Sequence, residues 1–201
     1  MIDTNPMIYV VDDDKAVTES ITWLLDSIGL EAFAYNSPRQ FLEDFELHEG
    51  PVCIVLDVRM PEISGLELAE KIMEQRQDAC LVFLSAHGDV PTAVRGIKAG
   101  AVDFLQKPFD PQIFLDTINS LLRLANERYP LREKELARKK ALEMLSPRER
   151  ETFELLIKGQ SSKEIGRSFK ISPKTVDIHR ANILRKVGVA TQRDLIHQYQ
   201  I

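Results

Sequence analysis

Short apolar runs alternate with amphipathic stretches along the first 125 residues of the chain. The runs have the Val, Ile, Leu and Phe content of buried strands, and they cover residues 8–11, 31–35, 52–57, 80–84 and 102–105. Between them, apolar residues recur at spacings of three and four, which predicts helices over 15–28, 38–45, 66–75, 90–99 and from 111 onward. Strands that alternate with helices at this spacing predict a doubly wound α/β domain with a five-stranded parallel sheet.

Residues 144–201 carry four helix starts, each with its own capping residue. Ser146 and Ser161 are each followed three residues later by Glu, the form of a capping box. Ser172 precedes a first-turn proline, and Thr191 can cap a last helix. Four short helices, two of them joined by a tight turn, predict a small all-α helix-turn-helix domain.

A charge-rich segment, residues 126–143, lies between these domains and predicts an exposed linker helix that is interrupted or kinked near Pro130. We therefore divide the chain into a domain over 1–125, a linker helix over 126–143 and a domain over 144–201. Residues 1–125 hold 9 Lys and Arg against 21 Asp and Glu, whereas residues 126–201 hold 17 against 10. The basic rear indicates a polyanionic partner.

Other features limit the class of protein. No apolar run approaches the roughly 18 residues of a membrane span, and the first residues do not form a signal peptide. We therefore expect a cytoplasmic protein without a membrane partner. Cys53 and Cys80 lie in predicted strands and are expected to be buried, reduced thiols. No group of Cys and His has the spacing of a zinc site.

Reactive side chains stand where four of the predicted strands end. Asp12 and Asp13 follow the first strand, Asp57 ends the third, Ser85 the fourth, and Lys107 follows the fifth. In the flavodoxin-like strand order 2-1-3-4-5, which we expect here, these ends share one edge of the sheet. Clustered carboxylates need a cation, and hard oxygen ligands suit Mg²⁺. A carboxylate can attack a phosphoryl group, so this edge is interpreted as a phosphoryl-transfer site with Asp57, Ser85 and Lys107 as its catalytic residues.

The sequence around these strand ends reads Asp12-Asp13, Asp57 with Met60-Pro61 and Gly65, Ser85-Ala86, and Lys107-Pro108-Phe109. It resembles the receiver domain of two-component response regulators over residues 7–125, and residues 87–104 are most similar to the FixJ branch. The resemblance implies that a sensor histidine kinase phosphorylates Asp57.

The resemblance also assigns a metal site. It implies that Asp13, Asp57 and the Arg59 carbonyl bind Mg²⁺, with Asp12 acting through water. It further implies that Arg59 and His87 tune the lifetime of the aspartyl-phosphate.

A conformational response is implied as well. Ser85 and Phe104 would form a switch pair that senses the phosphoryl group, and the Lys107–Pro108 peptide bond would be cis. The surface of the helix at 90–99, the fifth strand and the helix at 111–125 would then form a homodimer.

The predicted helix over 172–187 has a core-facing stripe of Val176, His179/Arg180, Ile183, Leu184 and Val187. Its opposite face holds Lys174, Asp177, Ile178, Ala181 and Arg185. With Leu145-Ser146-Pro147-Arg148-Glu149 and Lys163-Glu164-Ile165-Gly166, this sequence resembles LuxR-type DNA-binding domains over 144–198. In a helix-turn-helix the second helix enters the major groove.

This second resemblance implies DNA contacts at single residues. Base contacts are expected from Asp177, Ile178 and Ala181, and phosphate contacts from Lys174, Thr175, His179 and Lys186. Asp177 can accept from a cytosine amino group, or it can serve only to orient Arg180 or Lys174. A dimer would bind an imperfect palindrome of double-stranded DNA, with RNA polymerase as a further partner.

The sequence therefore predicts a phosphorylation-controlled transcription factor of the FixJ/NarL type that catalyses only its own phosphorylation and dephosphorylation. The competing class is a phosphatase of the haloacid dehalogenase type. Such enzymes need an Asp two residues after the nucleophile, and Arg59 stands there. Regulation through RNA or through protein contacts alone is disfavoured by the basic helix-turn-helix.

Overall fold

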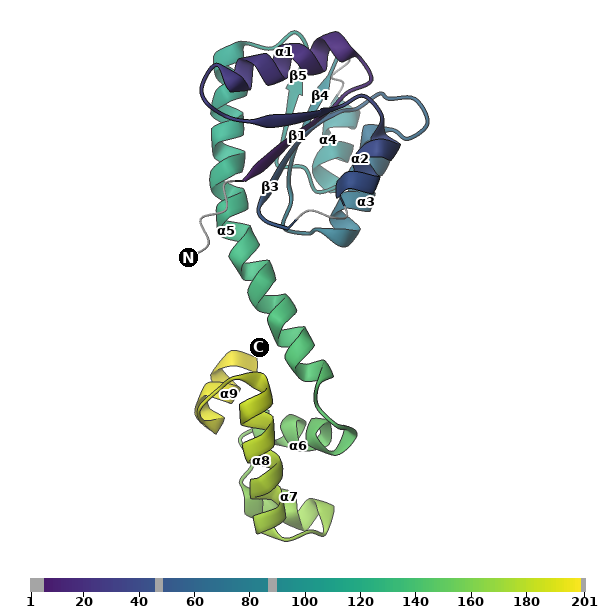
Figure 1. The fold of residues 1–201 in the computed structure, drawn as a ribbon. Helices are drawn as coiled ribbons and strands as arrows, with labels where there is room; N and C mark the ends of the chain where they lie inside the picture. Colours follow the sequence, from purple (N-terminus) through teal and green to yellow (C-terminus); the bar gives the residue numbers. More distant parts are fainter. Residues whose placement is uncertain (1–5, 46–48, 87–89, 200–201) are drawn as a thin grey trace. The chain divides into compact units, whose positions relative to one another are not determined.

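The computed structural model describes residues 6–45, 49–86 and 90–199, and His87, predicted to tune the phosphate lifetime, lies outside them. The chain forms two compact units, Met1–Arg132 and Glu133–Ile201. Unit 1 contains the sheet and its helices, and unit 2 is helical (Figure 1).

Unit 1 is built on a parallel sheet with strand order β2-β1-β3-β4-β5. Its strands are β1 (Met7–Val11), β2 (Ala32–Tyr35), β3 (Val52–Asp57), β4 (Cys80–Ser85) and β5 (Asp103–Gln106). Every residue of β3 and β4 is buried, as the continuous apolar runs require of central strands. The predicted flavodoxin-like order is confirmed.

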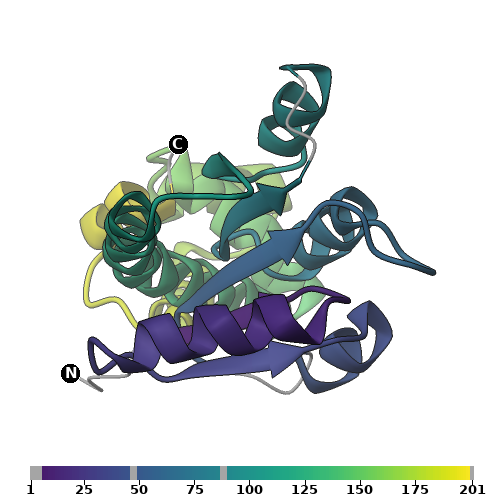
Figure 2. The same ribbon diagram turned by 90° about the horizontal axis from the view of Figure 1, so that it is seen from above.

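Helices cover both faces of this sheet (Figure 2). They are α1 (Lys15–Asp26), α2 (Pro38–Phe45), α3 (Gly65–Gln75), α4 (Val90–Lys98) and α5 (Pro111–Glu143). Helices α1 and α5 pack on one face through buried residues such as Leu25 and Phe114, and α2 and α3 pack on the other through Phe41 and Ile72. Cys53 and Cys80 are free, buried and adjacent across β3 and β4. Burial raises the pKa of both thiols.

Helix α5 continues through Pro130, so of the two alternatives predicted there, an interruption or a kink, the interruption is wrong. A proline removes one backbone donor, but the side chains around this one are anchored on unit 1. Arg132 lies 3.1 Å from the buried carboxylate of Asp78, and Tyr129 lies under the Arg76 guanidinium. Arg76 itself forms a bidentate pair with Asp78 at 3.0 and 2.9 Å. These contacts favour a continuous helix over a break.

Unit 2 holds the end of α5 and four short helices. These are α6 (Pro147–Ile157), α7 (Ser162–Phe169), α8 (Pro173–Val187) and α9 (Gln192–Tyr199). The predicted capping boxes at Ser146 and Ser161 are present, Ser172 caps α8, and Thr191 exchanges hydrogen bonds with Asp194 at the start of α9. Among the described residues of both units, no helix combines the length and apolar character needed to cross a membrane.

Candidate functional site

The carboxyl edge of the sheet brings together three of the predicted site residues. The Lys107 ammonium donates to Asp12 Oδ2 at 2.5 Å and to Asp57 Oδ1 at 2.6 Å. The second oxygen of Asp57 accepts from the Arg59 backbone N–H at 2.5 Å. Asp12 and Asp57 are 3% and 7% exposed. The cis Lys107–Pro108 bond is confirmed. The lysine that follows β5 thus bridges the carboxylate that follows β1 and the carboxylate that ends β3.

The electrostatics of this bridge favour an added cation. Burial raises the pKa of Asp12, and the hydrogen bond from Lys107 offsets only part of that rise. Burial lowers the pKa of Lys107, but its hydrogen bonds to Asp12 and Asp57 outweigh that effect and the pKa rises. One ammonium therefore serves two buried carboxylates, which leaves an excess of negative charge.

The residues fit a hard divalent cation. Asp13 is exposed next to Asp12 at the same strand end. Within the ranges that the structure describes, no three His, Cys, Asp or Glu side chains gather as a metal group. Mg²⁺ commonly takes only one or two carboxylates and completes its shell with water and phosphate oxygens. Two buried carboxylates with spare negative charge suit that mode of binding.

Gly65, the first residue of α3, holds the loop after Asp57 in place. Its backbone N–H donates to the Val58 carbonyl at 3.0 Å. A Cβ at this position would lie 1.9 Å from the backbone oxygen of Asp57, and Cβ atoms do not approach backbone oxygens so closely. Only glycine therefore lets α3 begin against the end of β3.

We expect Gly65→Ala to slow phosphorylation of the protein by acetyl phosphate about tenfold or more, because Asp57 must shift and misplacement near 1 Å is costly in phosphoryl transfer. The rate of phosphate incorporation measures the effect. Gly29→Ala is the control: Gly29 has a φ of +79° with open space around it, so its substitution strains the backbone away from Asp57. Equal rates for the two variants would contradict this role of Gly65.

Of the predicted switch pair, Ser85 lies beside the bridge, whereas Phe104 stands on β5 opposite Phe83 of β4. Ser85 is 2% exposed, and its carbonyl accepts from the Lys107 backbone N–H at 2.8 Å. The Phe104 ring packs against Phe83 with centroids 6.5 Å apart. Gly96 rests on the same two rings, since a Cβ there would lie 2.8 Å from Phe83 and 3.7 Å from Phe104. A rotation of the Phe104 ring would therefore change the packing of α4 at Gly96.

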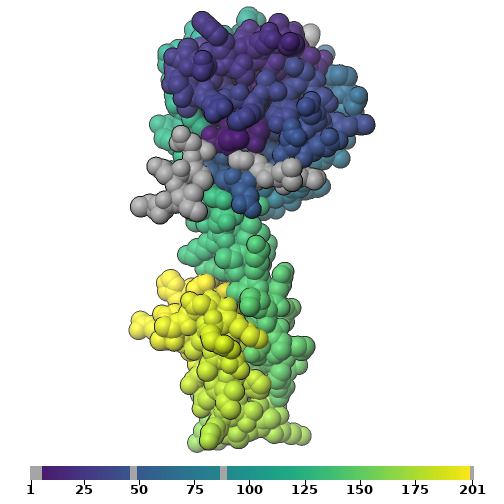
Figure 3. Space-filling model, in the orientation of Figure 1, coloured from purple at the N-terminus to yellow at the C-terminus, as the bar shows by residue number. Residues whose placement is uncertain are grey.

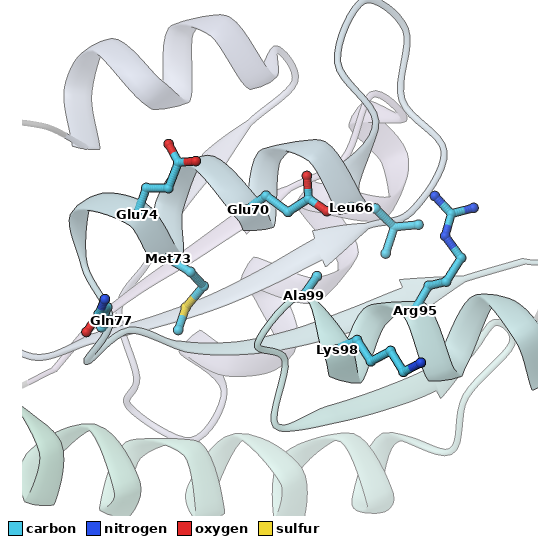
Figure 4. A pocket seen from close by; sticks show the side chains of 8 residues that line it. All are labelled: Leu66, Glu70, Met73, Glu74, Gln77, Arg95, Lys98 and Ala99. Atoms are coloured by element: carbon cyan, nitrogen blue, oxygen red, sulfur yellow. The ribbon is translucent and has the colours of Figure 1, made fainter.

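Helix α4 is loosely attached to the rest of unit 1. Gly96 is the one residue of Val90–Lys98 that is buried. A groove of about 520 Å³ separates α4 from α3, with an acidic wall on α3, a basic wall on α4 and a partly apolar floor (Figure 4). Its lining residues are Leu66, Glu70, Met73, Glu74, Gln77, Arg95, Lys98 and Ala99. An element so weakly packed can shift at little cost.

The candidate DNA interface is the α7–α8 pair of unit 2. Gly166 makes the turn between them tight, since a Cβ there would lie 2.9 Å from the Ile171 carbonyl oxygen. Helices α8 and α9 are seen at one surface of the unit, in yellow-green and yellow (Figure 3). The exposed residues of α8 include Lys174, Asp177 and Ile178, the last 57% exposed. Thr175 and Ala181 are also exposed, and His179 is half-buried.

Lys186 differs from the other predicted phosphate contacts because its ammonium is used inside unit 2. It donates to Glu149 Oε2 at 2.6 Å and to the Met144 carbonyl at 3.1 Å. Glu149 is 5% exposed and also accepts from the Ser146 backbone N–H. The hydrogen bond from Lys186, which outweighs burial, lowers the pKa of Glu149 to about 2. This residue therefore joins α6 to α8, and we leave it out of the proposed DNA contacts.

We expect the pair of buried Glu149 and half-buried Lys186 to make unit 2 sensitive to acid. Folded Glu149 keeps its charge down to a pH of about 2, whereas unfolded Glu takes up its proton near a pH of about 4.3. The pair therefore stabilises unit 2 fully above the unfolded pKa and loses that effect as the pH falls through the folded one. We expect Glu149→Gln to flatten the acid dependence of unit 2, measured from the NMR amide signals of α6 and α8 in the full chain. Glu154→Gln, an exposed acid on the same helix, should follow the wild-type curve, and identical curves for all three would refute the argument.

Two family models match the chain: the response regulator receiver domain over residues 8–119 and the luxR family of bacterial regulatory proteins over residues 143–199. The chain belongs to the response regulator family. The response regulator protein TmoT of Ectopseudomonas mendocina is 40% identical over 197 residues, which cover 98% of this chain and 89% of TmoT. The transcriptional regulatory protein FixJ of Bradyrhizobium diazoefficiens is 38% identical, with 96% and 94% covered.

A solved structure extends the likeness to both units of this response regulator. The low-resolution structure of the response regulator StyR is 38% identical with a TM-score of 0.75, over 97% of this chain and 98% of that one. The response regulator thus combines a receiver with a LuxR-type DNA-binding domain and is a transcriptional regulator of a two-component system, as the sequence predicts.

Proposed function

We propose that Asp57 of this regulator accepts a phosphoryl group from a sensor histidine kinase and that the modified protein dimerises and binds promoter DNA. The observation that carries the proposal is the bridge of Asp12, Lys107 and Asp57 at the carboxyl edge of the sheet, beside buried Ser85. It brings a buried nucleophile, the half-buried positive charge of Lys107 and a buried hydroxyl-bearing residue to one edge of the sheet. These are the groups that phosphoryl transfer uses for positioning and charge neutralisation.

In the proposed reaction an Asp57 carboxylate oxygen attacks phosphorus. A new oxygen–phosphorus bond forms while the phosphorus–nitrogen bond of the kinase phosphohistidine breaks, and the imidazole leaves with the electron pair. The Lys107 ammonium, now on Asp57 Oδ1, transfers its hydrogen bond to a phosphoryl oxygen. The Ser85 hydroxyl donates to another. The catalytic chemistry of the protein is limited to this gain of a phosphoryl group and its later loss by hydrolysis.

A magnesium ion would be held by Asp13, Asp57 and the Arg59 carbonyl, with Asp12 acting through water. When bound, Mg²⁺ neutralises charge on the carboxylates and the phosphoryl oxygens. Arg59 follows Asp57 by two residues and donates its backbone N–H to that carboxylate. We propose this position as one that sets the lifetime of the aspartyl-phosphate.

The phosphoryl group is coupled to dimerisation through Ser85, Phe104 and α4. Movement of the Ser85 hydroxyl toward the phosphate leaves space into which the Phe104 ring turns, and Gly96 transmits that turn to α4. Large apolar side chains are exposed on α4, just before β5 and in the first turn of α5, together with the charged Arg95 and Lys98 of α4: Val90, Val94, Ile97, Val102 and Ile113 are 76%, 46%, 49%, 38% and 56% exposed. Such a patch is typical of a surface that pairs with another protein, here a second copy of the receiver.

A dimer presents two α8 helices to DNA. Half-sites then lie about one turn, roughly 34 Å, apart, and the operator is an imperfect palindrome. Asp177, Ile178 and Ala181 contact base edges, and phosphates are contacted by Lys174, Thr175 and His179. The setting is the cytoplasm, with RNA polymerase as a further partner at the promoter.

This function is tested by selecting genomic DNA fragments with the full chain, with and without acetyl phosphate and Mg²⁺. We expect the donor to enrich a palindromic site. Lys174→Ala should weaken binding to all sequences and lower the dependence on salt by about one phosphate contact. Ile178→Ala should instead change which sequences are selected. If both variants merely lose affinity in parallel, the division of the α8 surface into phosphate and base contacts is wrong.

A further inference from the structure

On the exposed face of α8, one carboxylate is fixed by two neighbouring side chains. Ser162, the first residue of α7, donates its hydroxyl to Asp177 Oδ1 at 2.6 Å. Arg180 pairs with the same oxygen at 3.1 Å and also donates to the Ser162 hydroxyl at 3.3 Å. Three side chains from two helices thus close a triangle, which we name the Asp177 triad.

The triad leaves one oxygen of Asp177 open. In the part of the chain that the structure describes, both contacts go to Oδ1 and no group donates to Oδ2. The Asp177 side chain is 49% exposed, and it stands on the helix beside exposed Ile178. The carboxylate therefore has a fixed orientation and one free position, and that position can only accept a hydrogen bond.

Arg180 also reduces the electrostatic repulsion between Asp177 and DNA. A carboxylate at a DNA surface is repelled by the phosphates, whose charge dominates binding. The guanidinium of Arg180 balances the formal charge of Asp177 within the triad. The Ser162 hydroxyl adds a donor without adding charge. The triad can thus approach DNA without the full repulsion that an isolated aspartate would meet.

We propose that the Asp177 triad makes this regulator select cytosine at one position of each half-site, with Ser162 and Arg180 as positioning residues. The major-groove edge of cytosine presents an amino donor, whereas guanine and thymine present acceptors that repel a carboxylate. Adenine presents an amino donor next to the N7 acceptor, so it is the weaker partner. The proposal rests on the proposed function of α8 as the helix that reads DNA, and it names the base that one residue of that helix recognises.

The test is selection of binding sites from a randomised DNA library by the full chain treated with acetyl phosphate and Mg²⁺. We expect the wild type to prefer cytosine about tenfold at one position per half-site. Asp177→Asn should shift that position to adenine, because an amide both donates and accepts. Ser162→Ala should reduce the preference to about threefold or less and leave the other positions unchanged. Ser168→Ala removes an exposed hydroxyl of α7 that donates to the Glu164 carbonyl of its own helix, so it should select the wild-type motif.

Three results would overturn the proposal, and they differ from one another. An unchanged motif with Asp177→Asn means that Asp177 reads no base. A motif that changes with Asp177→Asn but not with Ser162→Ala removes the positioning role of the triad. A wild type that enriches no motif overturns the proposed function of α8 as well. Ser162→Ala also decides the matter if Asp177→Asn fails to fold, since the Ser162 side chain can be shortened without loss of core packing.

Discussion

Asp57→Asn is expected to abolish labelling of the protein by acetyl phosphate in the presence of Mg²⁺. An amide nitrogen or oxygen is a poor nucleophile toward phosphorus, whereas the carboxylate forms the acyl phosphate directly. The substitution is nearly isosteric, and the Lys107 ammonium can still donate to the amide oxygen. A loss of labelling would therefore reflect the missing nucleophile and not a disrupted site. Mass spectrometry of the intact protein and of its peptides measures it.

The matched control is Asp103→Asn, an exposed acid of β5 that should be labelled like the wild type. Wild-type labelling of Asp57→Asn would show that another carboxylate is the acceptor. Asp12 and Asp13 would be the first alternatives, because they stand at the neighbouring strand end. Peptide mapping of the labelled variant would identify the acceptor.

Ser85→Ala is expected to keep part of the phosphate uptake and to lose most of the shift from monomer to dimer. The hydroxyl is proposed to move toward the phosphoryl group and so to let the Phe104 ring turn beneath α4. Without the Ser85 hydroxyl, Asp57 can still be phosphorylated, but the Phe104 ring does not turn and α4 does not shift at Gly96. Sedimentation velocity with and without beryllofluoride and Mg²⁺ measures the shift, in which the phosphoryl group acts as the ligand that biases two states.

Ser20→Ala, which removes an exposed hydroxyl of α1 that bonds to the Ala16 carbonyl, should dimerise like the wild type. If Ser85→Ala also dimerises fully, the path from Ser85 through Phe104 is wrong. A wild type that is dimeric at every concentration with and without the mimic would remove dimerisation as the controlled step.

The fold could be predicted because its elements are encoded locally. The continuous apolar run over 52–57 is typical of a central parallel strand, and β3 is buried throughout. Each helix of unit 2 after α5 is preceded in the sequence by a capping residue, such as Ser146 or Ser161. Pro130 shows the limit of local reasoning. Its effect depends on Arg132 and Asp78, which are far apart in sequence and meet only in the folded unit.

The sequence predicted which residues make up the site but not which of them contact one another. The ends of parallel strands share an edge, so Asp12, Asp57 and Lys107 had to be neighbours. That Lys107 would bridge both carboxylates does not follow from spacing. Lys186 shows the converse, since a basic residue on a basic helix gives no sign that its partner is a buried glutamate on another helix. The contact of Ser162 with Asp177 could not be predicted either. In the sequence, Ser162 is only the residue next to the capping residue of α7, and nothing there indicates a partner on α8.

The central claim is that a phosphoryl group on Asp57 controls DNA binding. The most direct measurement is the affinity of the full chain for its selected operator, by fluorescence anisotropy, with and without beryllofluoride and Mg²⁺, beside Asp57→Asn under the same conditions. The account predicts that the mimic tightens binding of the wild type about tenfold or more, the range of ordinary coupling energies, and leaves Asp57→Asn unchanged. Equal affinities for the wild type in both conditions, or an equal gain for Asp57→Asn, would contradict it.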